Sequence, residues 1–267
     1  MEKIRNPAKL AFERPLATVD LVIFTVSDDS LKVLLVRRPS ATQDAGEPFP
    51  GRWALPGGFV DVARDASLEA CAARKLKEKT GLSTPYLEQL GSWGDAARDP
   101  RGWSATHAYF ALVHAPLETQ EMQKAQEAHH VHDVQDVLEG LAAPIADAQT
   151  SSLQWIELES AGKKRLAFDH GKILAAAVDR LRSKVEYTSL PAYLLAEPFT
   201  LPQLQQAYEV VLARPVDKSA FRKRMLDAGF LAEAGQVDGG AGRLAMGYRI
   251  TDRATPATFP RTFKPRE

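Results

Sequence analysis

The chain of 267 residues contains a single cysteine, Cys71, so no disulfide can form within it. No run of about 18 apolar residues is present, which argues against a membrane-spanning helix. The segment 1–15 leads to no apolar stretch of the kind that directs secretion. We therefore expect a cytoplasmic protein with no membrane partner, in which Cys71 is a small buried side chain rather than a nucleophile.

The chain also lacks a net charge, because 34 Lys and Arg balance 34 Asp and Glu. This balance neither favours nor excludes nucleic acid as a partner. Residues 188–267, however, carry 11 basic against 8 acidic side chains. Such a bias suits an anion-binding module at this end. The length itself favours two domains.

The first two thirds of the sequence alternates strand patterns with two amphipathic helices. Leu68, Cys71, Ala72 and Leu76 recur at helical spacing within the predicted helix 67–79. A charged loop is expected at 95–102. A polar helix is expected over 118–141; its His129, His130 and His132 have no cysteine or acidic partner in a clear metal-binding pattern, so no metal site is predicted. Strands are expected at 18–26, 31–36, 53–58, 87–93, 105–113 and 153–158, and the second amphipathic helix at 169–184.

The last 80 residues change to short helices followed by two strands. Helices are expected at 190–196, 201–212 and 218–228, and strands on either side of a glycine-rich tip at 235–242. Three helices followed by a β-hairpin is the order of a winged helix.

The third of these helices separates apolar from basic side chains. Phe221 and Met225 share one face and should point to the core. The opposite face carries Lys218, Ser219, Arg222 and Lys223, as a DNA-recognition helix requires. Arg243 and Arg249 in the expected wing could contact the phosphate backbone. The alternative is an ordinary solvated basic face.

The segment 74–82, together with Leu55–Phe59 upstream, resembles the Nudix box, whose helix ends in R-E-U-x-E-E-x-G-U with U aliphatic. In Nudix hydrolases the glutamates of this helix gather divalent cations against a diphosphate. Here Lys75 and Lys79 occupy two of those positions, and Glu78 remains. The sequence therefore predicts a degenerate box with no catalytic residue and no metal.

Two further departures support that prediction. The glutamate that the pattern requires eight residues before Arg74 is replaced by Ala66, and Gly58 lies two residues too far from the helix. The side chains of Lys75, Glu78 and Lys79 share one helix face. They form either a solvated salt-bridge face or a site where the lysines meet the phosphates of a ligand directly.

Other ligand contacts are predicted around the expected cleft. Arg98 and Arg101 could bind a diphosphate through their guanidinium groups, or could anchor their own loop through salt bridges. Trp53 and Phe59 could stack on an adenine or belong to the core. Arg37 and Arg38 end a strand that leads toward the cleft.

The chain as a whole, from Pro15 to Ile250, resembles the NrtR family of Nudix-related regulators of NAD metabolism. The resemblance rests on ATVD at 17–20, WALPGGFV at 53–60, RDPRG at 98–102, LAFDH at 166–170, KVEY at 184–187, FTL at 199–201 and DKSAFR at 217–222.

This resemblance implies an α+β fold, a Nudix α/β/α sandwich with a mixed sheet that a linker helix joins to a winged helix-turn-helix domain. The expected boundaries are 1–165 for the Nudix-like sensor, 166–186 for the linker helix, and 187–267 for the DNA-binding domain and tail. It further implies a homodimer that binds a palindromic operator in double-stranded DNA. The expected effector is ADP-ribose or a related nucleotide, and the expected role is repression of NAD or nucleotide metabolism genes.

Three alternatives remain at this point. The chain could be a weakly active Nudix pyrophosphohydrolase of the ADP-ribose pyrophosphatase type. It could regulate sugar metabolism with a sugar as effector, as related regulators do. It could also be a nucleotide-binding adaptor whose winged helix contacts protein instead of DNA.

Overall fold

The structure is a computed structural model that describes residues 14–40, 47–81, 84, 86–114, 153–239 and 243–263. The helix expected over 118–141, with its three histidines, falls outside this part. In the described residues no helix is long and apolar enough to cross a membrane.

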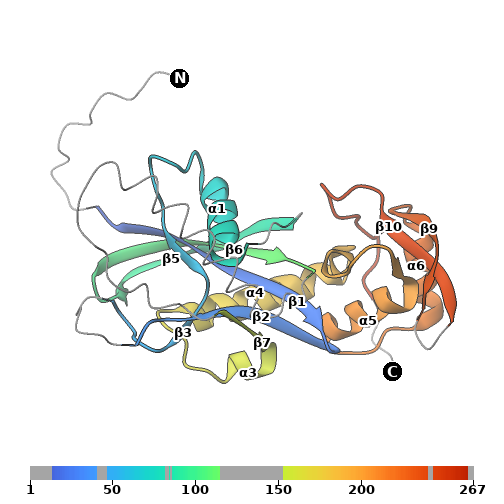
Figure 1. Ribbon diagram of the computed structural model, residues 1–267, viewed down its shortest axis with the longest axis horizontal. Coiled ribbons are helices and arrows are strands. Elements are labelled where there is room, and N and C mark those ends of the chain that lie inside the picture. Colours follow the sequence, from blue (N-terminus) through green and yellow to red (C-terminus); the bar gives the residue numbers. More distant parts are fainter. Residues whose placement is uncertain are drawn as a thin grey trace, which may run out of the picture.

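The N-terminal part is built on a seven-stranded mixed sheet with the order β3-β2-β1-β6-β5 (Figure 1). β4 pairs with β1 and β7 pairs with β2 outside this order. β1 and β6 are parallel, and the other pairs are antiparallel. The strands are β1 (Leu16–Ser27), β2 (Ser30–Arg37), β3 (Trp53–Ala54), β4 (Gly57–Phe59), β5 (Tyr86–Asp99), β6 (Gly102–Leu112) and β7 (Leu153–Glu157).

Helices cover both faces of this sheet. Successive side chains of a strand point to opposite faces, so each face carries its own set of apolar side chains for a helix to cover. α1 (Leu68–Thr80) packs Cys71 and Leu76 against the face that contains Leu21. α4 (His170–Val185) packs against the opposite face, which contains Val22 and Phe24. The predicted α/β/α sandwich and the burial of Cys71 are thus confirmed. A short helix, α3 (Leu158–Gly162), was not expected.

α1 begins and ends at residues suited to those positions. The Ser67 hydroxyl accepts a hydrogen bond from the Ala70 N–H, which satisfies a free donor of the first turn. Gly81 ends the helix in the left-handed conformation, with φ of 68°. These two residues set where α1 begins and ends. The helix between them packs against β1 and β4.

The segment 95–102, expected as a charged loop, is mostly strand. β5 continues to Asp99, turns through Pro100 and Arg101, and returns as β6 from Gly102. The prediction of a loop was wrong because this stretch has few β-branched residues, whereas pairing with β6 holds it extended.

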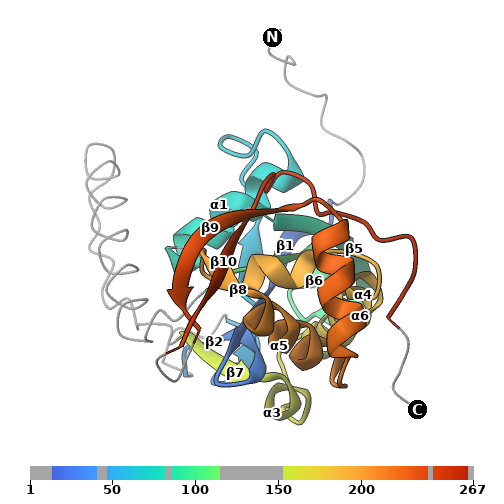
Figure 2. The same ribbon diagram turned by 90° about the vertical axis from the view of Figure 1, so that its right-hand side faces the viewer.

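The C-terminal part has the predicted winged-helix order. It contains η1 (Leu190–Leu194), α5 (Leu201–Leu212) and α6 (Lys218–Asp227), and then a three-stranded sheet in the order β8-β10-β9 (Figure 2). The strands are β8 (Phe199–Thr200), β9 (Leu231–Asp238) and β10 (Leu244–Ile250).

Three details of this part differ from expectation. The first helix is a 3₁₀ turn, and β8 adds a strand that the sequence pattern did not predict. Gly235, expected in the glycine-rich tip, lies within β9 with φ of 82°.

A single apolar core runs from the α4 face of the sheet through η1 and α5 to Phe221 of α6. The two parts of the molecule therefore pack directly on each other.

Candidate ligand pocket and nucleic-acid interface

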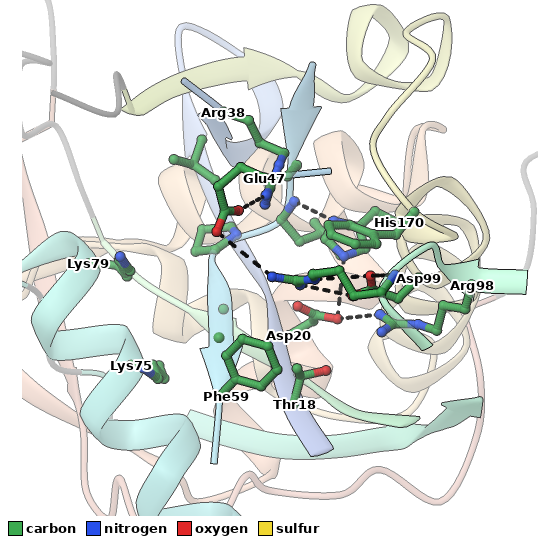
Figure 3. Close-up of a pocket in the computed structure, with 18 of the residues that line it drawn as sticks. Thr18, Asp20, Arg38, Glu47, Phe59, Lys75, Lys79, Arg98, Asp99 and His170 are labelled. Atoms are coloured by element: carbon green, nitrogen blue, oxygen red, sulfur yellow. Dashed lines mark hydrogen bonds and ion pairs between the residues drawn. The ribbon is translucent and has the colours of Figure 1, made fainter. Parts of the chain in front are cut away.

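A cavity of about 400 Å³ opens between α1, β4, the β5–β6 turn and the beginning of α4 (Figure 3). Its lining draws on segments far apart in the sequence. The residues are Thr18, Asp20, Val36, Arg38, Pro39, Glu47, Ala54, Leu55, Pro56, Gly57, Gly58, Phe59, Lys75, Lys79, Arg98, Asp99, Arg101, Phe168 and His170.

Two glycines of β4 allow the close approach of neighbouring groups. A Cβ atom on Gly57 would lie 2.4 Å from Asp20 Oδ1, which no side chain could tolerate. Gly58 has φ of 154°, and a Cβ there would lie 3.1 Å from Lys75 Nζ. The glycine pair thus brings β4 against Asp20 and leaves room for the Lys75 side chain over the strand.

Lys75 and Lys79 both point from α1 into this cavity, one turn apart (Figure 3). The Lys75 ammonium group lies 3.8 Å from the carboxylate of Glu78. Burial lowers the pKa of Lys79 below its ordinary value, and the neighbouring positive charge of Lys75 lowers it further. An anion in the cavity would relieve both effects.

Glu78, the remaining glutamate of the box, lies outside the cavity lining. Arg74 donates two hydrogen bonds to it, at 2.9 and 3.0 Å, and Arg64 approaches it at 3.2 Å. Arg74 also donates to both carboxylate oxygens of Asp65, at 2.6 Å each. Asp65, nine residues before Arg74, is therefore the acidic partner of that arginine. The Nudix pattern places the acidic residue eight positions before Arg74, where the sequence has Ala66, so the pattern does not identify Asp65 in this role.

Arg98 is almost fully buried and bridges two carboxylates. Its Nη2 donates to Asp20 at 2.7 Å and its Nε donates to Asp169 at 2.8 Å. Burial alone would raise the pKa of Asp20, but the adjoining His170 ring and the Arg98 guanidinium hold it below its ordinary value. Arg98 thus ties β1 to the first turn of α4 at the floor of the cavity.

The same first turn of α4 contributes His170, which is 3% exposed. The Leu55 N–H donates to His170 Nδ1 at 2.8 Å, so the ring proton must lie on Nε2. Nε2 in turn faces Asp20 Oδ2 at 3.4 Å. This assigns the neutral tautomer to the ring and fixes α4 to the backbone between β3 and β4.

Arg38 and Arg101 both line the cavity with Glu47 between them, and Figure 3 shows Glu47 beside Arg38. Glu47 forms a short ion pair with Arg38 and lies 3.8 Å from Arg101 Nη1. Arg101 also pairs with Asp99 at 2.9 Å, and its guanidinium lies 5.2 Å from the centre of the half-exposed Phe59 ring. A carboxylate thus occupies the space between two cations that an anionic ligand could contact.

Of the nine predicted ligand residues, six line the cavity: Arg38, Phe59, Lys75, Lys79, Arg98 and Arg101. Arg37, Trp53 and Glu78 do not. Arg37 lies over the Trp53 ring at 6.0 Å and donates to the Gly51 carbonyl, and Trp53 packs against the edge of the core.

Phe168 is a lining residue that sequence reasoning did not select. It has φ of 52°, a conformation that bulky side chains seldom adopt. The centre of its ring lies 4.8 Å from the centre of the Phe49 ring. The guanidinium carbons of Arg38 and Arg98 lie 5.1 Å and 5.7 Å from the centre of the Phe168 ring. The available sequence signal was the aromatic residue directly before Asp169-His170, within the LAFDH segment at 166–170.

The basic face of α6 points to solvent. Phe221 and Met225 are buried, whereas Lys218, Ser219, Arg222 and Lys223 are exposed. Asp217 begins the helix by accepting a hydrogen bond from the Ala220 N–H at 2.8 Å. Arg243, before β10, and Arg249, within it, are also exposed. The arrangement presents donors on one helix and its neighbouring hairpin.

Comparison with known proteins bears on both parts. The family model of the NUDIX domain matches residues 16–177, and that of the NrtR DNA-binding winged helix domain matches residues 191–250. The "ADPR responsive transcriptional repressor NtrR" of Acinetobacter baylyi is 40% identical over 95% of this chain and 89% of its own length. The chain belongs to the Nudix-related NrtR family.

Two further relatives illustrate the range of this likeness. The crystal structure of NrtR from Shewanella oneidensis, complexed with a 27mer DNA, aligns with a TM-score of 0.75 and 37% identity, over 93% of this chain and 99% of that one. An ADP-ribose pyrophosphatase of Methanocaldococcus jannaschii is 36% identical over 33% of this chain and 45% of its own length. The NrtR-family likeness covers both parts of the molecule, whereas the enzyme matches one third.

The Nudix likeness implies a divalent cation, but the cavity donors do not fit one. The residues of α1 that line the cavity are ammonium groups, which repel a cation. The Asp20 carboxylate is engaged by Arg98 and His170. Within the described ranges no group of three His, Cys, Asp or Glu side chains is arranged to hold a metal ion.

Proposed function

We propose that this chain is a DNA-binding transcriptional repressor that responds to ADP-ribose, and that ADP-ribose binds in the Nudix cavity without a metal. The regulated genes would be those of NAD or nucleotide metabolism, as the family resemblance implies. The likeness to an ADPR-responsive repressor along 95% of the chain supports this proposal. The protein would act in the cytoplasm.

One observation carries the proposal: two lysines of α1 point into a cavity where the Nudix pattern requires carboxylates. A diphosphate between Lys75 and Lys79 would give the Lys79 ammonium group hydrogen-bond acceptors in place of the water that burial removes. Its negative charge would also offset the repulsion between the two ammonium groups. Arg38 and Arg101 could bind the outer phosphate or a ribose oxygen, and Phe59 offers an exposed ring to the adenine.

The same observation argues against catalysis. Hydrolysis of a diphosphate needs stabilisation of the attacking water and of the leaving oxygen, which divalent cations provide in many phosphate sites. Lysine at the two positions stabilises bound phosphate without activating water. We therefore assign no catalytic residue, and the role of the cavity is recognition.

The DNA arm of the proposal rests on α6. Its exposed face would enter the major groove, with Lys218, Ser219, Arg222 and Lys223 as donors to bases and phosphates. Arg243 and Arg249 would hold the backbone beside it. A homodimer would present two such helices to a palindromic operator, since operator symmetry follows protein symmetry.

Calorimetry in the presence of EDTA tests metal-free recognition. Lys75→Glu should weaken ADP-ribose binding by about a hundredfold or more, because it places a carboxylate against the phosphates. Lys77→Glu is the matched control, since Lys77 lies on the same helix but faces solvent. Equal affinities of the two variants would contradict the proposal.

Two assays test the activity and the response. Incubation of ADP-ribose with Mg²⁺ or Mn²⁺ and the protein should give no turnover; catalytic turnover would favour the pyrophosphohydrolase instead. A gel-shift titration should show ADP-ribose releasing the protein from its operator. Strengthened DNA binding would assign the opposite sign to the regulation.

A further inference from the structure

The chain continues beyond the end of the winged-helix match at residue 250. Residues 257–263, called the C-terminal strap below, run beside the connector between α4 and η1. The Phe259 N–H donates to the Tyr187 carbonyl at 2.7 Å, and the Ser189 N–H donates to the Ala257 carbonyl at 2.9 Å. Thr188 and Thr258 form an antiparallel bridge between these hydrogen bonds. The first three residues of the strap, 257–259, are therefore paired to the connector.

The end of the strap packs against α6, the helix proposed to read DNA. The Phe263 ring is buried, with its centre 5.9 Å from Phe221 of α6 and 5.2 Å from Tyr208 of α5. Arg224 of α6 places its guanidinium 3.9 Å from the centre of the Phe263 ring and donates to the Thr262 carbonyl at 2.9 Å. α6 buries two side chains, Phe221 and Met225, so the strap supplies a large part of its support.

The strap is also fixed to the far end of the pocket helix. Glu186, which follows the last residue of α4, accepts a hydrogen bond from the Phe263 N–H at 3.1 Å. Its other carboxylate oxygen accepts from Arg214, in the loop between α5 and α6, at 2.6 Å. Arg214 donates in turn to the Phe263 carbonyl at 3.1 Å. One carboxylate thus holds the strap and the loop that leads into α6.

α4 carries these contacts back to the cavity. Its first turn provides Asp169 and His170, which meet Arg98 and Leu55 at the cavity floor. Its last turns provide Arg182, whose Nε donates to the Val211 carbonyl of α5 at 3.1 Å. A packed helix moves as one body, so a shift at its first turn reaches Glu186.

We propose that the C-terminal strap is the positioning element that joins α4 to α6. Phe263 of the strap packs against α6, and Glu186 at the end of α4 holds the backbone of Phe263. The strap sets the angle at which α6 is presented to DNA and carries the ligand-dependent shift of α4 to that helix. This inference rests on the proposed function, since it concerns how the ADP-ribose cavity and the DNA-reading helix are coupled.

Phe263 and Glu186 are positioning residues, because neither lines the cavity nor belongs to the exposed face of α6. A ring that only filled space would affect stability and leave the response to ADP-ribose intact. A positioning ring changes the affinity for DNA and the factor by which ADP-ribose alters that affinity. The two roles are therefore separable by measurement.

The experiment compares the full-length wild type with Phe263→Leu, Glu186→Gln and Phe110→Leu. Phe110 is fully buried in the sheet and serves as the matched control for loss of an aromatic ring from the core. The probe is a duplex selected with the wild type from a random pool. Fluorescence anisotropy gives its affinity with and without ADP-ribose, calorimetry gives the affinity for ADP-ribose, and circular dichroism establishes that each variant is folded.

Phe263→Leu should bind the selected duplex at least about tenfold more weakly, because α6 loses its aromatic support, and should bind ADP-ribose within about twofold of wild type. Glu186→Gln should reduce the effect of ADP-ribose on duplex affinity by about threefold or more, since it removes the charge that holds strap and loop. Phe110→Leu should leave both quantities within about twofold of wild type.

Duplex affinity and ADP-ribose response close to wild type in both strap variants would overturn the inference, as would an equal loss in Phe110→Leu. If the wild type binds the duplex but ignores ADP-ribose, the proposed function fails, and the duplex affinity of Phe263→Leu still tests the strap. If Phe263→Leu does not fold, the response of Glu186→Gln decides.

Discussion

Helices α1 and α6 both carry lysines on one face, but they expose them to different surroundings. α1 turns Lys75 and Lys79 into a cavity, where burial and mutual repulsion lower the pKa of Lys79. α6 turns Lys218 and Lys223 outward, where both are exposed and Lys223 pairs with Asp227 at 2.6 Å. One face is therefore enclosed by protein, and the other is open.

This difference predicts two kinds of anion recognition. Enclosed charges interact through a medium of lower polarity, so they are screened little by salt and select an anion that fits the space. Exposed charges are screened strongly and bind any polyanion, with selectivity left to base contacts. Placement, rather than the number of lysines, therefore separates a small-molecule site from a DNA surface.

The largest expected contrast lies in the dependence on salt. Between about 50 and 200 mM salt, DNA binding should weaken by about a thousandfold or more if a dimer neutralises about six phosphates, because counterions are released. ADP-ribose binding should weaken by less than about tenfold over the same range. Anisotropy and calorimetry at matched salt concentrations give the two slopes. Equal slopes would remove the distinction between the helices.

Arg98 sharpens the comparison because it lines the cavity but already pairs with two carboxylates. Arg98→Met should lower the free energy of unfolding by about 3–5 kcal/mol, since it leaves the buried Asp20 without its charged partner. Urea denaturation measures this loss. Lys163→Met, at an exposed ion pair on α3, is the control and should change stability by less than about 1 kcal/mol. A stable Arg98→Met protein would show that Arg98 acts mainly on ligand.

The pH dependence of ADP-ribose binding should report the buried lysine. Only protonated Lys79 attracts phosphate, so affinity should fall as pH rises through its lowered pKa, approaching about tenfold for each further pH unit. Lys79→Arg keeps its charge and should show no such fall. In the ligand-free protein the sign is opposite: the unfolded state binds more protons in this window, so the free energy of unfolding should rise with pH. Calorimetry and denaturation from neutral to alkaline pH give both trends.

Glu47 gives the smallest expected effect. Its carboxylate lies between Arg38 and Arg101, where it would compete with an anionic ligand. Glu47→Gln should strengthen ADP-ribose binding by up to about fivefold, because an exposed ion pair contributes about 1 kcal/mol or less. Weaker binding in this variant would mean that Glu47 contacts the ligand favourably.

Elements with strong local signals were predictable from the sequence. α5 spans the predicted 201–212, and the cap at Thr200, reinforced by Gln203, is of the kind that marks a helix start. The extension of β5 through 95–99 was missed, because that stretch is charged and its extended form depends on pairing with β6, where Asp95 lies opposite Ser104 and Asp99 opposite Gly102. Gly235 within β9 was missed for a related reason, since glycine more often ends a strand than continues it.

The site divides in the same way. The shared direction of Lys75 and Lys79 follows from the helical repeat alone. The partners of Arg98 do not, because they lie 78 and 71 residues away in the sequence. The turn of Glu78 toward Arg74 is an i,i+4 pair that local spacing could have predicted, whereas its ion pair with Arg64 comes from the segment before the helix. Tertiary pairing fixes the environment of Arg98, which the sequence pattern alone does not give.

The hydrogen bond from Leu55 to His170 has a consequence for how such proteins can be recombined. It joins residues 115 positions apart, and because Phe168 and His170 both line the cavity, the start of α4 is part of the cavity. A hybrid protein that fused residues 1–165 to a foreign DNA reader would leave this corner of the cavity unbuilt. Exchange of sensors between regulators, in the laboratory or in gene fusion, has to carry the opening turn of that helix along.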